Sequence, residues 1–252
     1  MPDYRCFCQI EWIQGDSILL SPEESNHLVA ANRARKGDPV RVFDGAGHEW
    51  DARLVDANKR KARLQIEHAH QFAPPEHTLA LAQAVPKGKL MESIIRKATE
   101  IGTQQLYPIL TSHTESRIEG KRQETKNQKW EAATLEGAKQ SGNPFLMRIE
   151  PLQDFSSFLE NAAQFELKLI ASLAPGAASL KTHWQRSLEK NGGQKPRSVI
   201  WLVGPEGDFT PDETQLALSC GFLPTTLGPH VMRCETAAQY ALSITQYELT
   251  TS

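Results

Sequence analysis

The sequence predicts an α/β fold in which a small β-rich domain precedes a larger domain with a mostly parallel sheet. Three observations predict it: short alternating segments dominate residues 4–70, consecutive prolines at 74 and 75 follow, and apolar strands then alternate with helices. With 252 residues, the chain can form two domains that each bury a core. We expect the domains to cover residues 1–72 and 73–252.

The elements of the first domain are short strands and one helix. Strands are predicted at 40–43 and 50–55, and the sequence Asp-Gly-Ala-Gly at 44–47 between them predicts a hairpin. Another strand is predicted at 62–67. Ser-Pro-Glu-Glu at 21–24 combines a cap, a first-turn proline and two acids, which is typical of a helix start. Residues 72–76 form the linker.

The elements of the second domain alternate between strand and helix. Nearly continuous apolar runs predict buried strands at 79–85, 105–110, 167–171, 199–203 and 223–227. Apolar residues at 90, 94, 95, 98 and 101 predict a helix that Gly102 ends. Further helices are expected near 126–139 and at 154–164, and residues 175–197 are expected to be rich in loop.

Composition excludes several classes of protein. No apolar run approaches the ~18 residues of a membrane span, and the first residues lack a signal-peptide core, so we expect a cytoplasmic protein. Cys6, Cys8, Cys220 and Cys234 have no metal-ligand spacing, so we expect reduced thiols and no metal. Cys6 and Cys8 fit one face of a strand.

Three clusters of basic residues favour a polyanionic partner, although the net charge is −2. Any one of them alone is as well explained as a solvated surface. The first two clusters lie in the expected first domain. The clusters are Arg33, Arg35 and Lys36; Lys59, Arg60, Lys61 and Arg63; and Arg117, Lys121, Arg122, Lys126 and Lys129.

A first glycine loop, residues 204–209, follows the strand at 199–203. Residues 210–213 then supply a Thr cap, a first-turn proline and the Glu of a capping box, so a helix follows the loop. Ligands of parallel sheets bind at such strand ends, and Gly204 and Gly207 allow the backbone to approach a ligand. Glu206 and Asp208 would repel phosphate, so a neutral or cationic ligand fits better. The alternative is a tight structural turn.

A second glycine loop, residues 227–235, lies one strand–helix unit later. It contains Gly228, Arg233 and Glu235, and a helix is expected to start near Thr236. An exposed ion pair between Arg233 and Glu235, worth ~0–1 kcal/mol, is the alternative interpretation of the two charges. We expect the two loops to lie on adjacent strand ends and to enclose one ligand.

Several segments together resemble one known family. They are Gly-Pro-Glu-Gly at 204–207 with Asp-Glu at 212–213, and Leu-Gly-Pro-x-Val-Met-Arg-x-Glu-Thr-Ala at 227–237. Phe-Asp-Gly at 43–45, residues 83–92, residues 97–102 and Gln-Ser-Gly at 140–142 add support. These residues closely resemble the ribosomal small subunit methyltransferase E family of the SPOUT superfamily.

The resemblance implies a fold, an activity and a set of site residues. The fold would be a PUA-like β-barrel domain followed by a SPOUT-type parallel sheet with a C-terminal trefoil knot. The activity would be S-adenosylmethionine-dependent methylation of N3 of a uridine in small-subunit (16S) ribosomal RNA, performed by a homodimer on the RNA or the small ribosomal subunit. We then predict that the first two basic clusters, Arg33, Arg35 and Lys36 and Lys59, Arg60, Lys61 and Arg63, bind RNA phosphates. The expected cofactor-binding residues are Leu202, Val203, Gly204, Glu206, Gly207, Leu227, Gly228, Val231, Met232, Arg233, Cys234 and Thr236.

Arg233 and Glu235 are the candidate catalytic residues. A fixed cation would stabilise the anion that forms when uridine N3 loses its proton, and we assign this role to Arg233. Glu235 would orient Arg233 or contact the cofactor. No general base is identified, although His230 is a candidate because histidine commonly acts as a general base.

The sequence departs from the family pattern at three positions. His230 and Asn143 stand where the family usually has arginine, and Asp208 stands where it usually has glycine. Two alternatives therefore stay open: a SPOUT methyltransferase for another RNA base, and a catalytically idle RNA-binding homologue.

Overall fold

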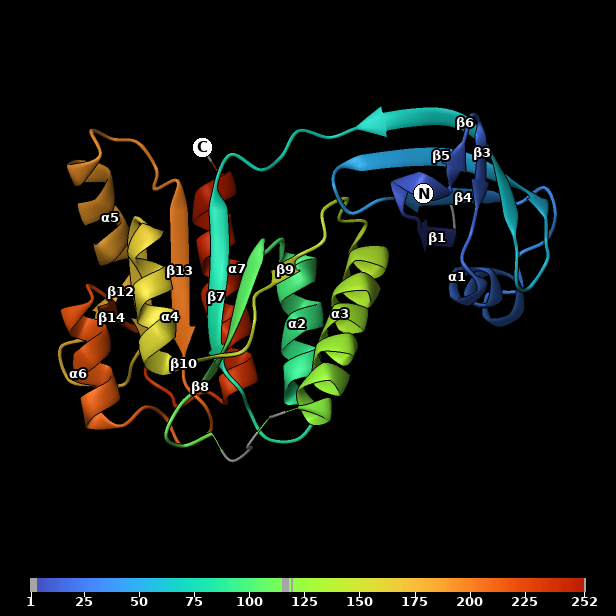
Figure 1. Cartoon of the computed structure of the whole chain (residues 1–252). Coiled ribbons are helices and arrows are strands. Elements are labelled where there is room, and N and C mark those ends of the chain that lie inside the picture. The colour runs from blue at the N-terminus through green and yellow to red at the C-terminus, as the bar shows by residue number, and fades with distance from the viewer. Residues whose placement is uncertain (1–3, 115–117, 119, 252) are drawn as a thin grey trace. The chain divides into compact units, whose positions relative to one another are not determined.

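The computed structural model describes residues 4–114, 118 and 120–251, which divide into two compact units (Figure 1). The first comprises Met1–Pro74 together with Leu135–Leu146, and the second comprises Pro75–Thr134 and Met147–Ser252. We expected the first domain to end at residue 72 and did not expect 135–146 in it. Arg117 of the third basic cluster lies outside the described residues.

The first unit is built on a six-stranded sheet in the order β1-β4-β5-β6-β3-β2. β1 pairs with β4 in parallel, and the other pairs are antiparallel. The elements are β1 (Tyr4–Phe7), β2 (Ile13–Gln14), β3 (Ser17–Leu19), α1 (Pro22–Asn26), β4 (Pro39–Phe43), β5 (His48–Asp56) and β6 (Arg63–Gln71), with a 3-10 turn at Ile10–Trp12 and a π turn at His27–Ala31.

The predicted hairpin and helix start of this unit are confirmed. Asp44 fixes the β4–β5 turn, because its Oδ1 accepts the backbone N–H groups of Ala46 at 2.8 Å and of His48 at 3.1 Å. Ser21 caps α1 by accepting the N–H of Glu24. Cys6 and Cys8 are both buried in the core of this unit, as expected from their spacing.

The second unit is a parallel sheet covered by helices on both faces. The strand order is β10-β8-β7-β13-β11-β14-β12, with β9 also paired to β8, and every described pairing is parallel. Its strands are β7 (Thr78–Ala84), β8 (Gln105–Leu110), β9 (Arg148–Ile149), β10 (Gln153–Asp154), β11 (Leu167–Ala171), β12 (Ala178–Ser179), β13 (Ser198–Val203) and β14 (Leu223–Thr226). Its helices are α2 (Leu90–Ile101), α4 (Phe155–Asn161), with a 3-10 turn at Ala162–Gln164, α5 (Leu180–Lys190), α6 (Pro211–Ser219) and α7 (Cys234–Thr250). The helix α3 (Lys121–Ser141) begins in this unit, and its residues from Leu135 onward belong to the first unit.

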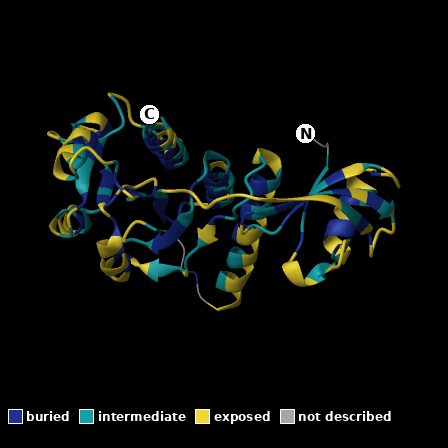
Figure 2. Ribbon diagram, turned by 90° about the horizontal axis from the view of Figure 1, so that it is seen from above, coloured by how far each residue is buried: buried dark blue, intermediate teal, exposed yellow. Residues whose placement is uncertain are grey.

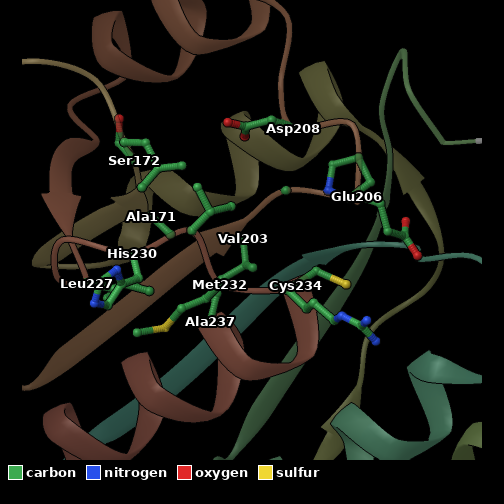
Figure 3. A pocket seen from close by; sticks show the side chains of 15 residues that line it. Ala171, Ser172, Val203, Glu206, Asp208, Leu227, His230, Met232, Cys234 and Ala237 are labelled. Atoms are coloured by element: carbon green, nitrogen blue, oxygen red, sulfur yellow. The ribbon is translucent and has the colours of Figure 1, made fainter.

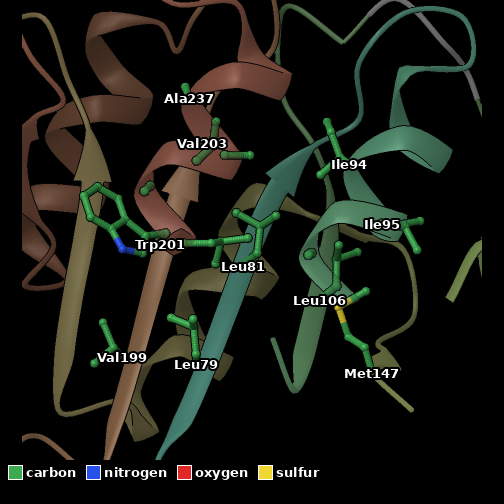
Figure 4. Packing of buried hydrophobic residues seen from close by; sticks show 14 of the residues in the cluster. Leu79, Leu81, Ile94, Ile95, Leu106, Met147, Val199, Trp201, Val203 and Ala237 are labelled. Atoms are coloured by element: carbon green, nitrogen blue, oxygen red, sulfur yellow. The ribbon is translucent and has the colours of Figure 1, made fainter. Parts of the chain in front are cut away.

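Alternate residues of the central strands pack into two separate cores. Figure 4 shows the core on the side of α2 and α7. Leu81 and Trp201 face α2 and α7, whereas Ala82 and Leu202 face α4 and α6. The burial of both faces explains why these strands read as continuous apolar runs (Figure 2). The sheet lies between the two cores, and a ligand is expected at the carboxyl ends of its strands.

One expectation for this unit is wrong. Residues 175–197 were expected to be loop-rich, but α5 occupies Leu180–Lys190. Ser179 caps it by accepting the N–H of Thr182, and Leu180 and Trp184, one turn apart, bury the inner face. The segment contains many polar residues and Gly-Gly at 192–193, so the helical spacing of Leu180 and Trp184 is not evident in the sequence. None of the described helices has the length and apolar character to cross a membrane.

Candidate cofactor pocket

A cavity of about 300 Å³ lies at the carboxyl ends of β11, β13 and β14 within the second unit (Figure 3). Its walls come from residues 171–173, 203–206, 208, 227, 230–234 and 237. The volume is at the lower end of the range of small-molecule sites, and strand carboxyl ends are where parallel α/β sheets bind ligands.

The strand order corrects the expected arrangement of the two glycine loops. β11 lies between β13 and β14, so the loops do not follow adjacent strands. Ala171, Ser172 and Leu173, at the end of β11, therefore form a third wall that was not predicted from the sequence. None of these three residues is a glycine or carries a charge. Since strand order does not follow from the sequence, no sequence signal pointed to them.

The first glycine loop is fixed by hydrogen bonds from neighbouring segments. The side-chain amide of Gln83 donates to the carbonyl oxygen of Gly204 at 3.3 Å, and the N–H of Lys87 donates to Glu206 Oε1 at 3.1 Å. His113 Nδ1 donates to the carbonyl oxygen of Asp208 at 2.8 Å. The end of β7 and the segments after β7 and β8 therefore hold this loop, and none of these three side chains lines the pocket.

The two glycines of this loop are required by the packing of the protein itself. A Cβ on Gly204 would lie 2.9 Å from Asp208 Oδ1, and a Cβ on Gly207 would lie 3.1 Å from the Cβ of His113. Contacts within the protein are thus a second reason for glycine at these positions, and the approach of their backbone to a ligand stays a prediction. Asp208 has a left-handed φ of 58°, a backbone conformation that glycine adopts without strain.

The second glycine loop is held by a local turn. The N–H of Gly228 donates to Thr226 Oγ1 at 3.2 Å, and the Thr226 hydroxyl donates to the carbonyl oxygen of Gly228 at 3.2 Å. Gly228 has φ +125°, yet a Cβ there would meet nothing within 4 Å. Val231 is 81% exposed at the pocket rim. The following helix, α7, begins at Cys234, two residues before the predicted start, with Arg233 as its N-cap residue.

The two loops approach each other through Glu206 and Cys234. Burial raises the pKa of the Cys234 thiol to about 12, and the negative charge of Glu206 contributes to the increase. The Cys234 Sγ lies 3.5 Å from Glu235 Oε2. Between Arg233 and Glu235, which both belong to the described residues, there is no ion pair. Glu235 contacts Cys234, and its side chain is not among the described groups that line the pocket.

The structure brings most of the predicted cofactor residues together. Those that line the pocket are Val203, Gly204, Glu206, Leu227, Val231, Met232, Arg233 and Cys234. Leu202, Gly207, Gly228 and Thr236 do not line it. The Leu202 side chain is fully buried on the opposite face of the sheet, so any contact with a ligand would involve its backbone. Pro205, Ala237 and the end of β11 line the pocket but were not predicted as site residues.

The chemistry of the walls suits a ligand with an apolar part and a positive charge. Val203, Leu227, Met232 and Ala237 form apolar surface, whereas Glu206 and Asp208 place carboxylates on the wall. The arginine that lines the pocket is Arg233, and this residue is exposed to solvent. Across the described ranges, no cluster of three His, Cys, Asp or Glu residues is placed to ligate a metal.

The seven predicted RNA-binding residues all lie exposed on the first unit. Arg33 has a left-handed φ of 59°. The backbone N–H of Arg35 donates to Asp38 Oδ2 at 2.8 Å, which fixes the backbone there. Asn143, where the family usually has arginine, belongs to this unit, and its carbonyl oxygen accepts a hydrogen bond from Arg5 at 3.2 Å.

Comparison with known proteins decides the family. A family model described as an RNA methyltransferase domain matches residues 74–246, and one described as an RNA methyltransferase PUA domain matches residues 20–67. The chain is 31% identical to Ribosomal RNA small subunit methyltransferase E of Synechocystis sp., over 95% of this chain and 76% of the relative. The chain belongs to the ribosomal RNA small subunit methyltransferase E family. The Bacillus subtilis member is 28% identical over 95% of this chain and 93% of its own.

Solved structures of similar proteins confirm the expected fold of this family member. A putative methyltransferase from Legionella pneumophila, in complex with the bound cofactor S-adenosylmethionine, matches with a TM-score of 0.87 and 27% identity over 97% of each chain. Ribosomal RNA small subunit methyltransferase E from Neisseria gonorrhoeae, bound to S-adenosylmethionine, matches with a TM-score of 0.83 and 25% identity over 98% of each chain. A PUA domain followed by a parallel α/β methyltransferase domain is thus confirmed.

Proposed function

We propose that this member of the family methylates N3 of a uridine in small-subunit ribosomal RNA and uses S-adenosylmethionine as methyl donor. The observation that carries the proposal is the pocket at the ends of β11, β13 and β14, in a chain whose structural relatives were solved with this cofactor. The PUA match at 20–67 supports RNA as the substrate class.

The pocket residues fit the cofactor. Val203, Leu227 and Met232 supply apolar surface for the adenine ring. Gly204 has no side chain, so its backbone groups in the pocket wall are accessible to the cofactor. Glu206 and Asp208 supply negative charge for the cationic methionine end. The bound cofactor would supply an electrophilic methyl group on a sulfonium, with the thioether as leaving group.

Arg233 would supply the charge stabilisation that the reaction needs. Uridine N3–H is weakly acidic, and its anion spreads negative charge onto O2 and O4. Arg233 lies at the pocket rim, at the N-cap of α7, so its guanidinium can face a base held at the mouth. A fixed cation there lowers the energy of the anion in the transition state. Glu235 would position the start of α7 through Cys234 rather than hold Arg233 directly.

Incubation of the protein with cofactor and small-subunit ribosomal RNA, followed by nucleoside mass spectrometry, tests the proposal. We expect one N3-methyluridine per RNA molecule. A methyl group on another base would support the alternative of a different SPOUT specificity. Cofactor binding in a calorimeter without any methylated nucleoside on RNA or on assembled subunits would contradict the proposed activity, and absence of cofactor binding would indicate the idle RNA-binding homologue.

The finer expectations of fold and surroundings form part of the same proposal. These are the trefoil knot, the homodimer, the cytoplasmic location, domain limits at residues 72 and 73, and RNA contacts by the two basic clusters of the first domain. Tyr240 and Tyr247, exposed by 44% and 66% on α7, support a dimer because they lie two turns apart on one helix. Light scattering tests the dimer: Tyr247→Asp should reduce the mass from two chains to one.

A further inference from the structure

The first half of α3 carries a stripe of positive charge. Arg122, Lys126 and Lys129 are spaced i, i+4 and i+7, so they lie on one face of the helix, and Lys121 adds a fourth cation at its start. Arg122 and Lys129 are exposed, whereas Lys126 is half-buried. We call Arg122, Lys126 and Lys129 the α3 stripe.

The charges of the stripe act on one another. Burial lowers the pKa of Lys126, and the positive charges of Arg122 and Lys129 lower it further, whereas Glu92 of α2 acts in the opposite direction. The ammonium group of Lys126 also lies 5.9 Å from the ring centroid of Trp130. Arg122 and Lys129 therefore lie close enough to Lys126 to make its charged form less favourable.

This arrangement is unfavourable for the helix itself. Lys121 and Arg122 lie in the first turn, where the helix dipole disfavours cations, and like charges at i, i+4 destabilise a helix. In contrast, Lys190 of α5 lies in the last turn, where the dipole favours it. A stability role would place the cations of α3 elsewhere, so the stripe is better explained by a function.

The stripe lies at the same edge of the sheet as the pocket. The chain leaves the carboxyl end of β8, and His113 then hydrogen-bonds to the carbonyl oxygen of Asp208 in the first glycine loop. Ile118 enters the core of the second unit, and α3 begins at Lys121. Figure 1 shows the first turn of α3 at the same side of the second unit as the carboxyl ends of β7 and β8, with α2 between them. An RNA strand spans many nucleotides, so a strand that delivers one base to the pocket can continue along this side to α3.

We infer that the α3 stripe binds the phosphate backbone of the substrate RNA next to the target nucleotide. The inference rests on the proposed function and adds a contact surface that lies on the methyltransferase domain rather than on the PUA domain. Phosphates would relieve the mutual repulsion of the three cations, which is the physical reason why the stripe favours this partner. Since phosphate contacts carry no base information, the stripe sets affinity and position and leaves the choice of base to the pocket.

The test compares two triple variants of the full chain in filter binding to deproteinised small-subunit ribosomal RNA. The first is Arg122→Gln with Lys126→Gln and Lys129→Gln. The control, Lys181→Gln with Arg186→Gln and Lys190→Gln, removes the same charge from exposed positions of α5 that do not form one stripe. Glutamine keeps helix propensity.

The stripe variant should bind RNA at least about tenfold more weakly. The slope of log affinity against log salt should fall by roughly two to three, at ~0.7–0.9 for each phosphate that the protein no longer neutralises. Helix content by circular dichroism and cofactor affinity should not change, so that a loss of RNA affinity reports the removed charge and not unfolding. The α5 control should keep the salt slope. Equal reductions of affinity in the two variants, or an unchanged slope in the stripe variant, would overturn the inference. Because the readout is RNA binding, it does not depend on which base is methylated or on whether methylation occurs.

Discussion

The two glycine loops of the pocket look alike in sequence but are held in different ways. The first, residues 204–209, is fixed by Gln83, Lys87 and His113, and its glycines are packed against the protein. The second, residues 227–235, is held by the local turn at Thr226 and Gly228 and carries the exposed Val231. From this difference we predict that the first loop keeps its shape without a ligand, whereas the second takes its final shape around its ligands. Substitutions at four positions test this comparison.

The largest expected effect is on the second loop, at Arg233. Arg233→Ala should lower the single-turnover methylation rate about a hundred- to a thousand-fold, because loss of one preorganised donor costs ~2.7–4 kcal/mol of barrier. Cofactor affinity, measured separately by calorimetry, should change little. Arg233→Lys should rescue only partly, since a point charge does not replace the planar guanidinium. Normal turnover of Arg233→Ala, or a defect confined to cofactor binding, would remove the catalytic assignment.

Gly228 should report on the shape of the second loop. Gly228→Val places a β-branched residue at φ +125°, which costs ~1–3 kcal/mol if the loop must keep this conformation around the cofactor. Cofactor affinity should therefore fall about 5- to 150-fold, with the free energy of unfolding almost unchanged, because the space around Gly228 lets the unliganded loop adjust. Wild-type affinity with a lower melting temperature would mean that the second loop is as preformed as the first.

Gly204 offers the matched substitution in the first loop. Gly204→Ala introduces a Cβ that lies 2.9 Å from Asp208 Oδ1 and 3.3 Å from Asp208 Cα. Overpacking of this kind costs ~1–3 kcal/mol, so denaturant unfolding should show a lower stability before any ligand is added. If this variant unfolds like the wild type and loses only cofactor affinity, the first loop is not preformed.

Glu213 ties the first loop to the segment after β8, and its effect should be the smallest. Its Oε1 accepts the N–H of Ser112 at 2.8 Å and the Ser112 hydroxyl at 3.0 Å, and its Oε2 accepts the N–H of Thr210 at 2.9 Å. Glu213→Gln keeps the size but exchanges one acceptor for a donor, so we expect a loss of ~0.5–2 kcal/mol.

The pH dependence of this loss has a defined sign. Burial raises the pKa of Glu213, but the hydrogen bonds from Thr210 and Ser112 outweigh it and hold the pKa below the ordinary 4.5. Its contribution is thus complete above pH 4.5 and is lost as the pH falls through the folded-state value. The stability difference between wild type and Glu213→Gln should shrink on acidification below pH 4.5, and a difference that stays constant would exclude the carboxylate as its source.

The local features of the fold could be predicted from the sequence, whereas long-range order could not. The capping box at Thr210 and Glu213 and the hairpin at 44–47 depend on residues close in sequence, and both are confirmed. The place of β11 between β13 and β14 depends on pairing between distant segments, so the wall at 171–173 was missed. The segment 135–146 was likewise not expected in the first unit, because its contacts there are with residues far away in the chain.

The position of β11 between β13 and β14 also affects the order in which the parts of the protein fold. The walls of the pocket come from segments near residues 171, 203 and 230, so it is assembled from contacts of high sequence separation, which form slowly. On the ribosome, the first unit can complete its fold once residues 135–146 have emerged, whereas the pocket must wait for β14 and the start of α7. The ability to hold a ligand at this site is therefore acquired last, and it marks a chain in which the whole second unit has folded.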